Sequence, residues 1–129
     1  MGLITMTDEA DAIAQKVRKA KTDPEPLPDS VEGLKDRPEA ENLMGIFAAL
    51  ADIDVEDVVH RFAGAPFSQF KEDLSALSID VLSPITAEMR RLMDDPAHID
   101  AVLEDGGERA GAIADRTMKE VKEIIGLLG

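Results

Sequence analysis

Four basic side chains gather near the amino end of the chain, at Lys16, Arg18, Lys19 and Lys21. Cations at this density could contact the phosphates of a nucleic acid. They could equally complement the carboxyl end of a helix, whose dipole favours Lys and Arg in the last turn. The chain as a whole has 14 Lys and Arg against 27 Asp and Glu, a net charge of −13. This balance argues against a general polyanion binder, so any contact with nucleic acid must be local.

Two histidines, His60 and His98, are the candidate general bases. No serine or carboxylate stands at a spacing that would tie either histidine into a catalytic triad. The chain has no cysteine, which excludes thiolate zinc sites, disulfides and cysteine nucleophiles. It also has no glycine-rich phosphate loop with its lysine. We therefore predict no catalytic residue in this chain.

Acidic residues crowd positions 52–57, in a pattern like the opening of a calcium-binding loop. Such a loop needs glycine at its sixth position and glutamate at its twelfth, where this chain has Asp57 and Ala63. The N-cap of a helix explains these acids better. The acidic pair at 94–95 likewise precedes Pro96, a combination that starts a helix. We therefore predict no metal site.

Apolar residues recur every three or four positions along the whole chain, which is the period of amphipathic helices. No segment alternates as a strand does, so we predict an all-α fold, a bundle of about six helices. Thr7 is the expected cap of the first helix, and Pro38 suits the first position of the second. Asp54 is the expected cap of a third helix that stops at Gly64, and Ser68 opens the longest helix.

Two interruptions are expected in the second half of the chain. Pro84 falls inside the longest apolar stripe, so we expect that helix to be kinked or broken near residues 82–83. A short helix over 96–103 should close at the glycines 106–107, and a last helix should span about 108–127.

Prolines at positions 24, 26 and 28 should stop the first helix and make 21–37 an extended, Pro-rich connector. The 129 residues suit a single domain over 1–129. No stretch approaches the ~18 apolar residues of a membrane span, and the amino end does not have the pattern of a signal peptide. We therefore expect a cytoplasmic protein with neither a membrane nor DNA as partner.

Several stretches together resemble the C-terminal region of bacterial tryptophanyl-tRNA synthetases, which are class I aminoacyl-tRNA synthetases. The similar stretches are DAIAQKVRKAKTDP at 11–24, RPEAENL at 37–43 followed by IFAAL at 46–50, FSQFK at 67–71, LSPI at 82–85 and RAGAIA at 109–114. The resemblance covers nearly the whole chain and rests on the order and spacing of these stretches.

The resemblance implies an α-helical domain that recognises the anticodon of tRNA(Trp) in protein biosynthesis. The full-length enzymes of the family use ATP and Mg, but their HIGH-like and KMSKS motifs have no counterpart here, so no cofactor is expected in this chain. The tryptophan–tRNA ligase activity of the family is therefore not expected of these residues alone. The module is expected to bind and position tRNA, either as part of a longer synthetase or as a free-standing relative.

The candidate tRNA-binding residues follow from the resemblance and the basic cluster. Arg18, Lys19 and Lys21 are the candidates for contacts with the RNA backbone. An alternative is that these three face the catalytic domain, because the first helix of this region lies near the ATP loop in the family. The weaker candidates for the RNA face are Arg37, Arg90 and Arg91. The four phenylalanines fall at core-like positions, so base readout should use polar side chains.

A second hypothesis comes from another functional class. A helical module of this kind could be a protein-interaction domain that pairs with itself or with a synthetase, and the net charge of −13 favours this over RNA binding. Ile113, Val121 and Ile124 of the last helix would form the apolar patch that seeks the partner. A hydrolase that uses His60 is a third, weaker option.

Overall fold

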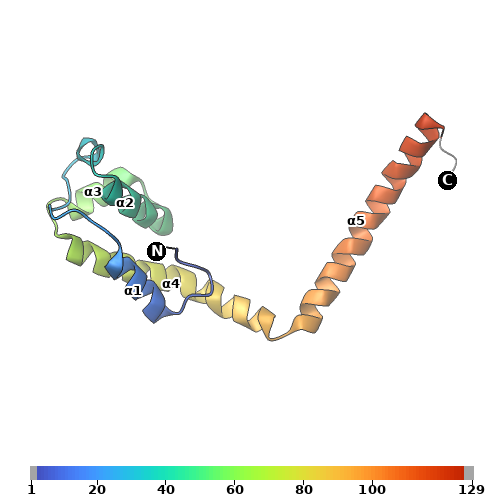
Figure 1. The fold of residues 1–129 in the computed structure, drawn as a ribbon, viewed down its shortest axis with the longest axis horizontal. Helices are drawn as coiled ribbons and strands as arrows, with labels where there is room; N and C mark the ends of the chain where they lie inside the picture. Colours follow the sequence, from blue (N-terminus) through green and yellow to red (C-terminus); the bar gives the residue numbers. More distant parts are fainter. Residues whose placement is uncertain (1–2, 127–129) are drawn as a thin grey trace. The chain divides into compact units, whose positions relative to one another are not determined.

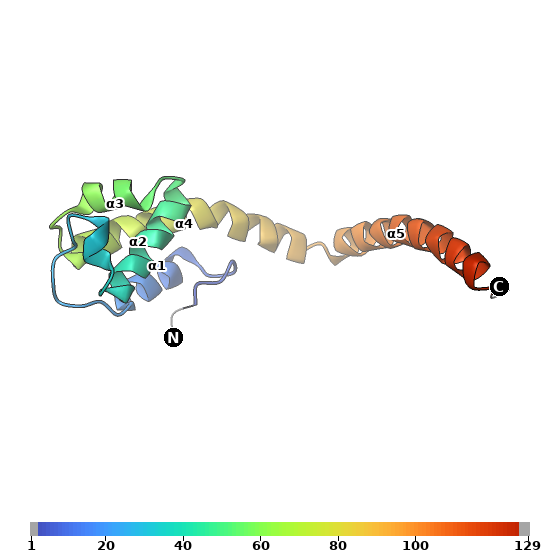
Figure 2. The same ribbon diagram turned by 90° about the horizontal axis from the view of Figure 1, so that it is seen from above.

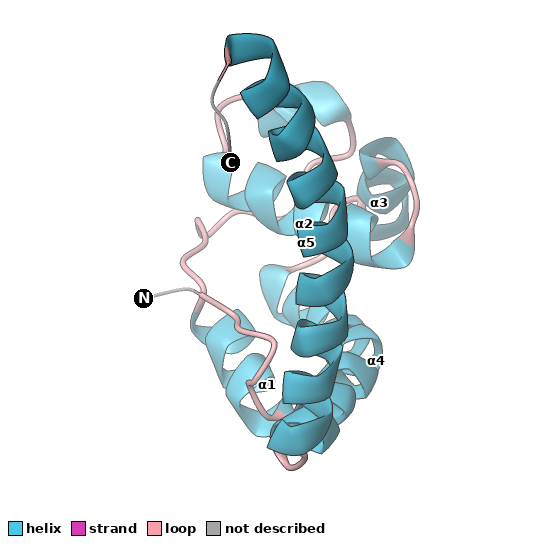
Figure 3. Cartoon of the chain, turned by 90° about the vertical axis from the view of Figure 1, so that its right-hand side faces the viewer, coloured by secondary structure: helices cyan, strands magenta, loops and turns pink. Residues whose placement is uncertain are grey.

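The computed structural model describes residues 3–126, and within this range it is all-α, as predicted, with no strand (Figure 3). Five α-helices and one short 3-10 helix follow one another along the chain. Their bounds are α1 Ala10–Lys19, 3-10 helix Val31–Leu34, α2 Pro38–Ala51, α3 Val55–Phe62, α4 Phe67–Met93 and α5 Pro96–Ile125. The prediction of about six helices is thus close, but the second half of the chain contains fewer interruptions than expected.

Helix α4 runs without a break through Pro84, so the break expected near residues 82–83 is absent. Proline lacks the N–H that would bond to the carbonyl four residues earlier, here that of Asp80. Asp80, Ser83 and Pro84 are all exposed, so water can reach this carbonyl. The proline therefore lies on the solvent side of α4, where the lost bond costs least.

Helix α5 also continues where a stop was expected. Gly106 and Gly107 both have helical geometry within α5, so the short helix and the last helix predicted from the sequence are one element (Figure 3). Glycine costs a helix interior about 1 kcal/mol relative to alanine. Because α5 has 30 residues, the hydrogen bonds of the helical turns on both sides of the glycines offset this cost.

Some of the expected helix ends are confirmed, but α4 begins at Phe67 instead of Ser68, and α5, with 30 residues against 27, is longer than α4. Pro38 is at the first position of α2, and Asp52 closes that helix in the left-handed conformation, with φ of 54°. The Asp95 carboxylate caps α5, because Oδ1 accepts a hydrogen bond from the backbone N of His98 at 3.2 Å. The prediction for Thr7 is wrong: α1 begins three residues later, after Glu9.

The connector between α1 and α2 is not simply extended, as its prolines predicted, but packs partly against the core. Leu27 and Leu34 are 2% exposed and belong to the hydrophobic core, and residues Val31–Leu34 form the 3-10 helix. The backbone N–H and C=O of Leu27 both form hydrogen bonds with the turn before α4. Its N donates to Ala65 O at 2.9 Å, and its O accepts from Gly64 N at 3.0 Å. The connector is therefore anchored at its middle.

The chain divides into two compact units, the first ending at Met89 and the second beginning at Arg90. In the first unit, α1, α2 and α3 gather around the amino-terminal half of α4 (Figures 1 and 2). Its core centres on three rings: Phe62 meets Phe47 and Phe70 edge-on, with centroids 5.2 and 4.9 Å apart. The expectation that all four phenylalanines lie in the core is confirmed, since Phe67 is also buried.

The second unit contains α5, which by itself is a long helix with no buried side chain among the residues described. Within residues 3–126, no helix combines the length and the apolar character that crossing a membrane requires.

Candidate functional site

The basic cluster lies on the last turns of α1 and just beyond them. Ile13 and Val17 bury one side of α1 in the core, so the residues that follow Val17 point outward. Lys16, on the flank, bonds to the carboxylate of Asp8, and this bond is the main reason that the pKa of Asp8 is below its ordinary value. One cation of the cluster is thus already neutralised within the chain.

Lys21 is engaged in a similar way but remains accessible. Its Nζ lies 3.0 Å from Oε1 of Glu39, and the hydrogen bond lowers the pKa of that carboxyl group. The Lys21 side chain is nevertheless 87% exposed. Exposed ion pairs of this kind contribute little net stability, so the pair can open at little cost.

Arg18 and Lys19 are different, because neither side chain forms an ion pair or a hydrogen bond with any residue in the described part of the chain. Both are exposed. The basic cluster therefore presents two uncompensated cations next to each other at the end of α1, on a chain whose net charge is −13.

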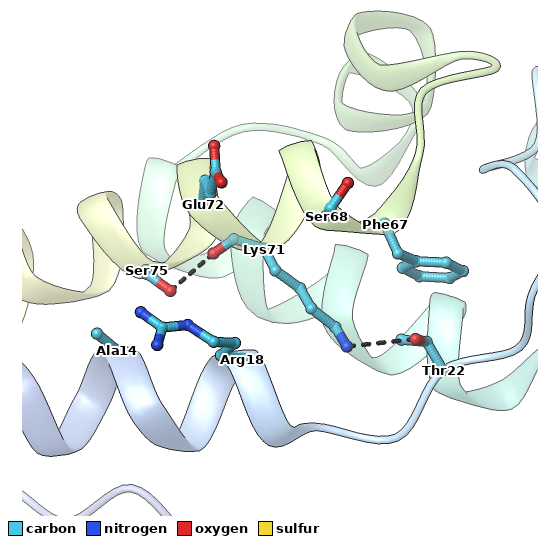
Figure 4. A pocket seen from close by; sticks show the side chains of 8 residues that line it. All are labelled: Ala14, Arg18, Thr22, Phe67, Ser68, Lys71, Glu72 and Ser75. Atoms are coloured by element: carbon cyan, nitrogen blue, oxygen red, sulfur yellow. Dashed lines mark hydrogen bonds between the residues drawn. The ribbon is translucent and has the colours of Figure 1, made fainter.

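A further cation, Lys71 on the second turn of α4, reaches across to the same end of α1 (Figure 4). Its Nζ donates to the backbone O of Ala20 at 2.7 Å and to Oγ1 of Thr22 at 3.2 Å. The Ala20 carbonyl lies directly after α1, where the helix dipole favours a cation. Lys71 is half-buried, and burial lowers the pKa of its ammonium group.

Between α1 and α4 lies a groove with a volume of about 530 Å³ (Figure 4). Its two charged ends come from different helices. Figure 4 shows the Arg18 guanidinium on the Ser75 side and the Lys71 ammonium on the Thr22 side. The lining residues are Ala14, Arg18, Thr22, Phe67, Ser68, Lys71, Glu72 and Ser75. Lys71 was not predicted from the sequence as a binding residue, although it is the single Lys or Arg between Arg61 and Arg90 and falls in the FSQFK stretch.

Arg37, one of the weaker candidates, has its guanidinium occupied within the chain. Nε and Nη2 bond to both carboxylate oxygens of Asp23, at 3.0 and 2.6 Å. Nη1 donates to Pro26 O at 2.6 Å and Nη2 to Glu25 O at 3.0 Å. The Arg37 side chain is 17% exposed, and its hydrogen bond lowers the pKa of Asp23. Four of the five N–H donors of Arg37 are thus used within the chain, so an RNA contact by Arg37 would compete with these bonds.

The remaining two candidates, Arg90 and Arg91, lie in the last turn of α4, at the start of the second unit. Both are exposed, and both interact with other residues of the chain. The surface that can be described as one site is therefore the one around the end of α1 in the first unit.

The residues discounted for chemistry occupy ordinary structural positions. His60 is exposed, with Nε2 3.8 Å from Oε1 of Glu56 one turn earlier in α3. Asp52 ends α2 and Asp54 precedes α3, which accounts for the acidic stretch at 52–57. Among residues 3–126, no group of three or more His, Asp or Glu side chains is arranged to hold a metal ion.

Comparison with known proteins finds relatives of this chain among tryptophan–tRNA ligases, although no protein-family model matches it. Over 125 residues, or 97% of the chain, it is 62% identical to the tryptophan–tRNA ligase of Rhizobium meliloti and 58% identical to that of Agrobacterium fabrum. The identity to the tryptophan–tRNA ligase of Rickettsia felis over the same length is 36%. The matched segment is 35 to 37% of these relatives, so the chain spans about a third of their length. The chain is homologous to tryptophan–tRNA ligases along almost all of its sequence.

Proposed function

We propose that this chain is a tRNA-binding helical module of the tryptophan–tRNA ligase type, which contacts tRNA(Trp) at its anticodon arm. The observation that carries the proposal is the 62% identity to a tryptophan–tRNA ligase over 97% of the chain. The role that we assign to these residues is binding and positioning of tRNA, not the chemistry of aminoacylation.

The local charge supports this role. A tRNA is a polyanion, and the net charge of −13 repels it at long range. Arg18 and Lys19 are exposed and uncompensated within the described chain, so they can approach phosphates without first breaking an ion pair. Lys21 would join them after release from Glu39. In this proposal Arg37, Arg90 and Arg91 are secondary contacts.

The aromatic side chains bear on how the bases would be read. Unpaired RNA bases are often stacked on exposed aromatic rings. The four phenylalanines are at most 8% exposed and pack in the core, and the chain has no Trp or Tyr. Base recognition in the proposed complex therefore falls to polar side chains, with backbone contacts supplying most of the affinity.

A salt titration of tRNA(Trp) binding tests the proposal, with an unrelated tRNA as competitor. We expect selective binding that weakens with salt. The double variant Arg18→Ala and Lys19→Ala removes two phosphate contacts, so it should lower the slope of log K against log salt by about 1.4 to 1.8. Lys35→Ala removes an exposed cation outside the cluster and serves as the matched control. Absence of binding even at low salt would contradict the proposal.

A second candidate function rests on α5. This helix exposes a stripe of apolar side chains that includes Ile113, Val121 and Ile124, at 72%, 39% and 83%. Exposed apolar surface of this kind often marks a protein interface, so the chain would pair with a second copy or with a synthetase. Light scattering over a wide concentration range tests the self-association. A strict monomer at every concentration would count against it.

A further inference from the structure

In the groove between α1 and α4, two cations from different helices line a single concave surface. Arg18 comes from α1 and Lys71 from α4. Its volume of about 530 Å³ falls in the range of ligand-binding clefts, about 300–1,000 Å³. Of these two cations, only Arg18 was predicted from the sequence as a binding residue, and the groove was not predicted.

The hydrogen-bonding state of each lining group shows what the groove can still bind. An ammonium group has three donors, and Lys71 uses two of them on Ala20 O and Thr22 Oγ1. The Thr22 hydroxyl accepts that bond and keeps its own proton to donate. Arg18 has all five of its guanidinium donors available. Ser75 already donates to Lys71 O at 2.7 Å, so it offers only acceptor capacity.

The charge balance of the groove selects an anion. Glu72 is the one acidic residue in its lining, against Arg18 and Lys71. Figure 4 shows the Glu72 carboxylate turned away from α1, toward the far side of α4. Burial alone lowers the pKa of Lys71, and no neighbouring carboxylate offsets this effect. An anion that arrives at Lys71 would therefore supply the counter-charge that the chain itself does not provide.

The placement of the two cations distinguishes among anions. The Arg18 guanidinium and the Lys71 ammonium flank the groove on opposite sides, next to Ser75 and Thr22 (Figure 4). A ligand that carries several anionic groups along one chain suits this placement. A chain of phosphodiesters can contact both, with different phosphates, while its intervening nucleotide occupies the groove.

We propose that the groove between α1 and α4 receives a short single-stranded run of RNA backbone, with Arg18 and Lys71 on separate phosphates. This inference rests on the proposed function for the identity of the RNA. It adds the groove and a new residue, Lys71 of α4, to the primary contacts proposed above, which all lie at the end of α1. Lys71 is held in place by its bonds to Ala20 and Thr22, so little side-chain entropy is lost when the phosphate binds.

The first experiment measures tRNA(Trp) binding by the 129-residue chain as a function of salt. Arg18→Gln and Lys71→Gln should each reduce the salt slope by about 0.7, the value for one phosphate of a single strand, and together by about 1.4. Lys71→Arg keeps the charge and should keep the slope. Arg116→Gln removes an equivalent charge from α5, where Arg116 is 84% exposed, and should leave the slope unchanged.

A second measurement does not depend on a variant folding correctly. Acetylation of lysine amines in the wild-type chain, followed by mass spectrometry, reports how accessible each lysine is. Bound tRNA(Trp) should slow the acetylation of Lys71 severalfold and leave that of Lys35, an exposed lysine outside the groove, unchanged.

The outcomes separate this inference from the proposed function. If tRNA(Trp) binds but Lys71 reacts at its free rate and Lys71→Gln keeps the wild-type slope, the groove proposal is overturned and the proposed function stands. If tRNA(Trp) does not bind at low salt, both are overturned. Binding with protection of Lys71 and loss of slope in both single variants supports both.

Discussion

Replacing Gly106 and Gly107 by alanine should stabilise α5. Both glycines have helical geometry in the interior of the helix, and a Cβ atom added at either position meets nothing within 4 Å. The substitution is therefore free of steric cost. Alanine is favoured over glycine in a helix interior by about 0.8–1.0 kcal/mol per residue, so the pair should contribute about 2 kcal/mol.

Amide hydrogen exchange across α5 measures this directly. A stabilisation of about 2 kcal/mol corresponds to a roughly 30-fold lower population of the opened helix, and exchange should slow by that factor at the centre of α5. Gly64→Ala is the matched control with the opposite sign. Gly64 has φ of 70°, where a side chain costs about 1–2 kcal/mol, so this variant should lower the stability of the first unit.

Unchanged or faster exchange in the Gly106→Ala and Gly107→Ala variant would refute this reasoning. It would mean that the two glycines are not helical in solution, as the sequence-based prediction of a stop at 106–107 had it. A gain in the Gly64→Ala variant would likewise contradict the left-handed geometry found at that residue.

Three other predictions concern the first unit. Phe70→Ala removes a fully buried ring that packs on two others, and it should cost about 3–5 kcal/mol in urea unfolding, whereas loss of less than 1 kcal/mol would show a loose core. Leu27→Ala should cost about 2–5 kcal/mol, although the residue lies between two prolines, and a neutral result would mean that the connector does not pack as described. The Arg37 hydrogen bond lowers the pKa of Asp23, so the ionised carboxylate favours the folded state above about pH 4, and this stabilisation disappears as the pH falls through the lowered pKa. The difference between the urea midpoints at neutral and acidic pH should therefore be smaller in Asp23→Asn than in the wild-type chain, and an equal difference in that variant would contradict the assignment.

Local signals of helix initiation were readable from the sequence because they act within a few residues. Pro38 and the Asp95 cap illustrate this: each depends on its own backbone conformation and on one neighbouring turn. Thr7 carried the same kind of signal, but other hydrogen bonds in the same segment prevent the helix from starting there. The Asp8 carboxylate instead accepts from Thr5 N at 2.8 Å and pairs with Lys16, which holds the chain in a turn before α1.

The predictions of helix breaks were wrong where the outcome depends on exposure to solvent or on the length of the helix. Pro84 and the glycines at 106–107 are helix breakers by propensity, yet a helix tolerates them where water reaches the freed carbonyl or where long flanking segments continue the helix. Periodicity alone cannot tell an exposed interior position from a terminus. The burial of Leu27 was similarly hidden, since its backbone partners lie at 64–65, far along the sequence.

The candidate site was predictable in part. The basic cluster is contiguous, so Arg18 and Lys19 were found directly. Which cations of the cluster are compensated could not be predicted, because Lys21 finds its acidic partner 18 residues away at Glu39. Lys71 lies 51 residues from Ala20, and only the packing of α4 against α1 brings its ammonium to that carbonyl.

The two backbone bonds at Leu27 should make the middle of the proline-rich connector a poor substrate for proteases. Such enzymes bind their substrates as extended strands whose own amide groups must be free. Here the middle of the segment is already paired with the turn at Gly64 and Ala65, and its leucine is in the core. We therefore expect proteases to cleave the peptide bonds next to Leu27 slowly while the first unit is folded. Although this segment has the composition of a flexible linker, its central leucine is thus held in the folded first unit by both its backbone and its side chain.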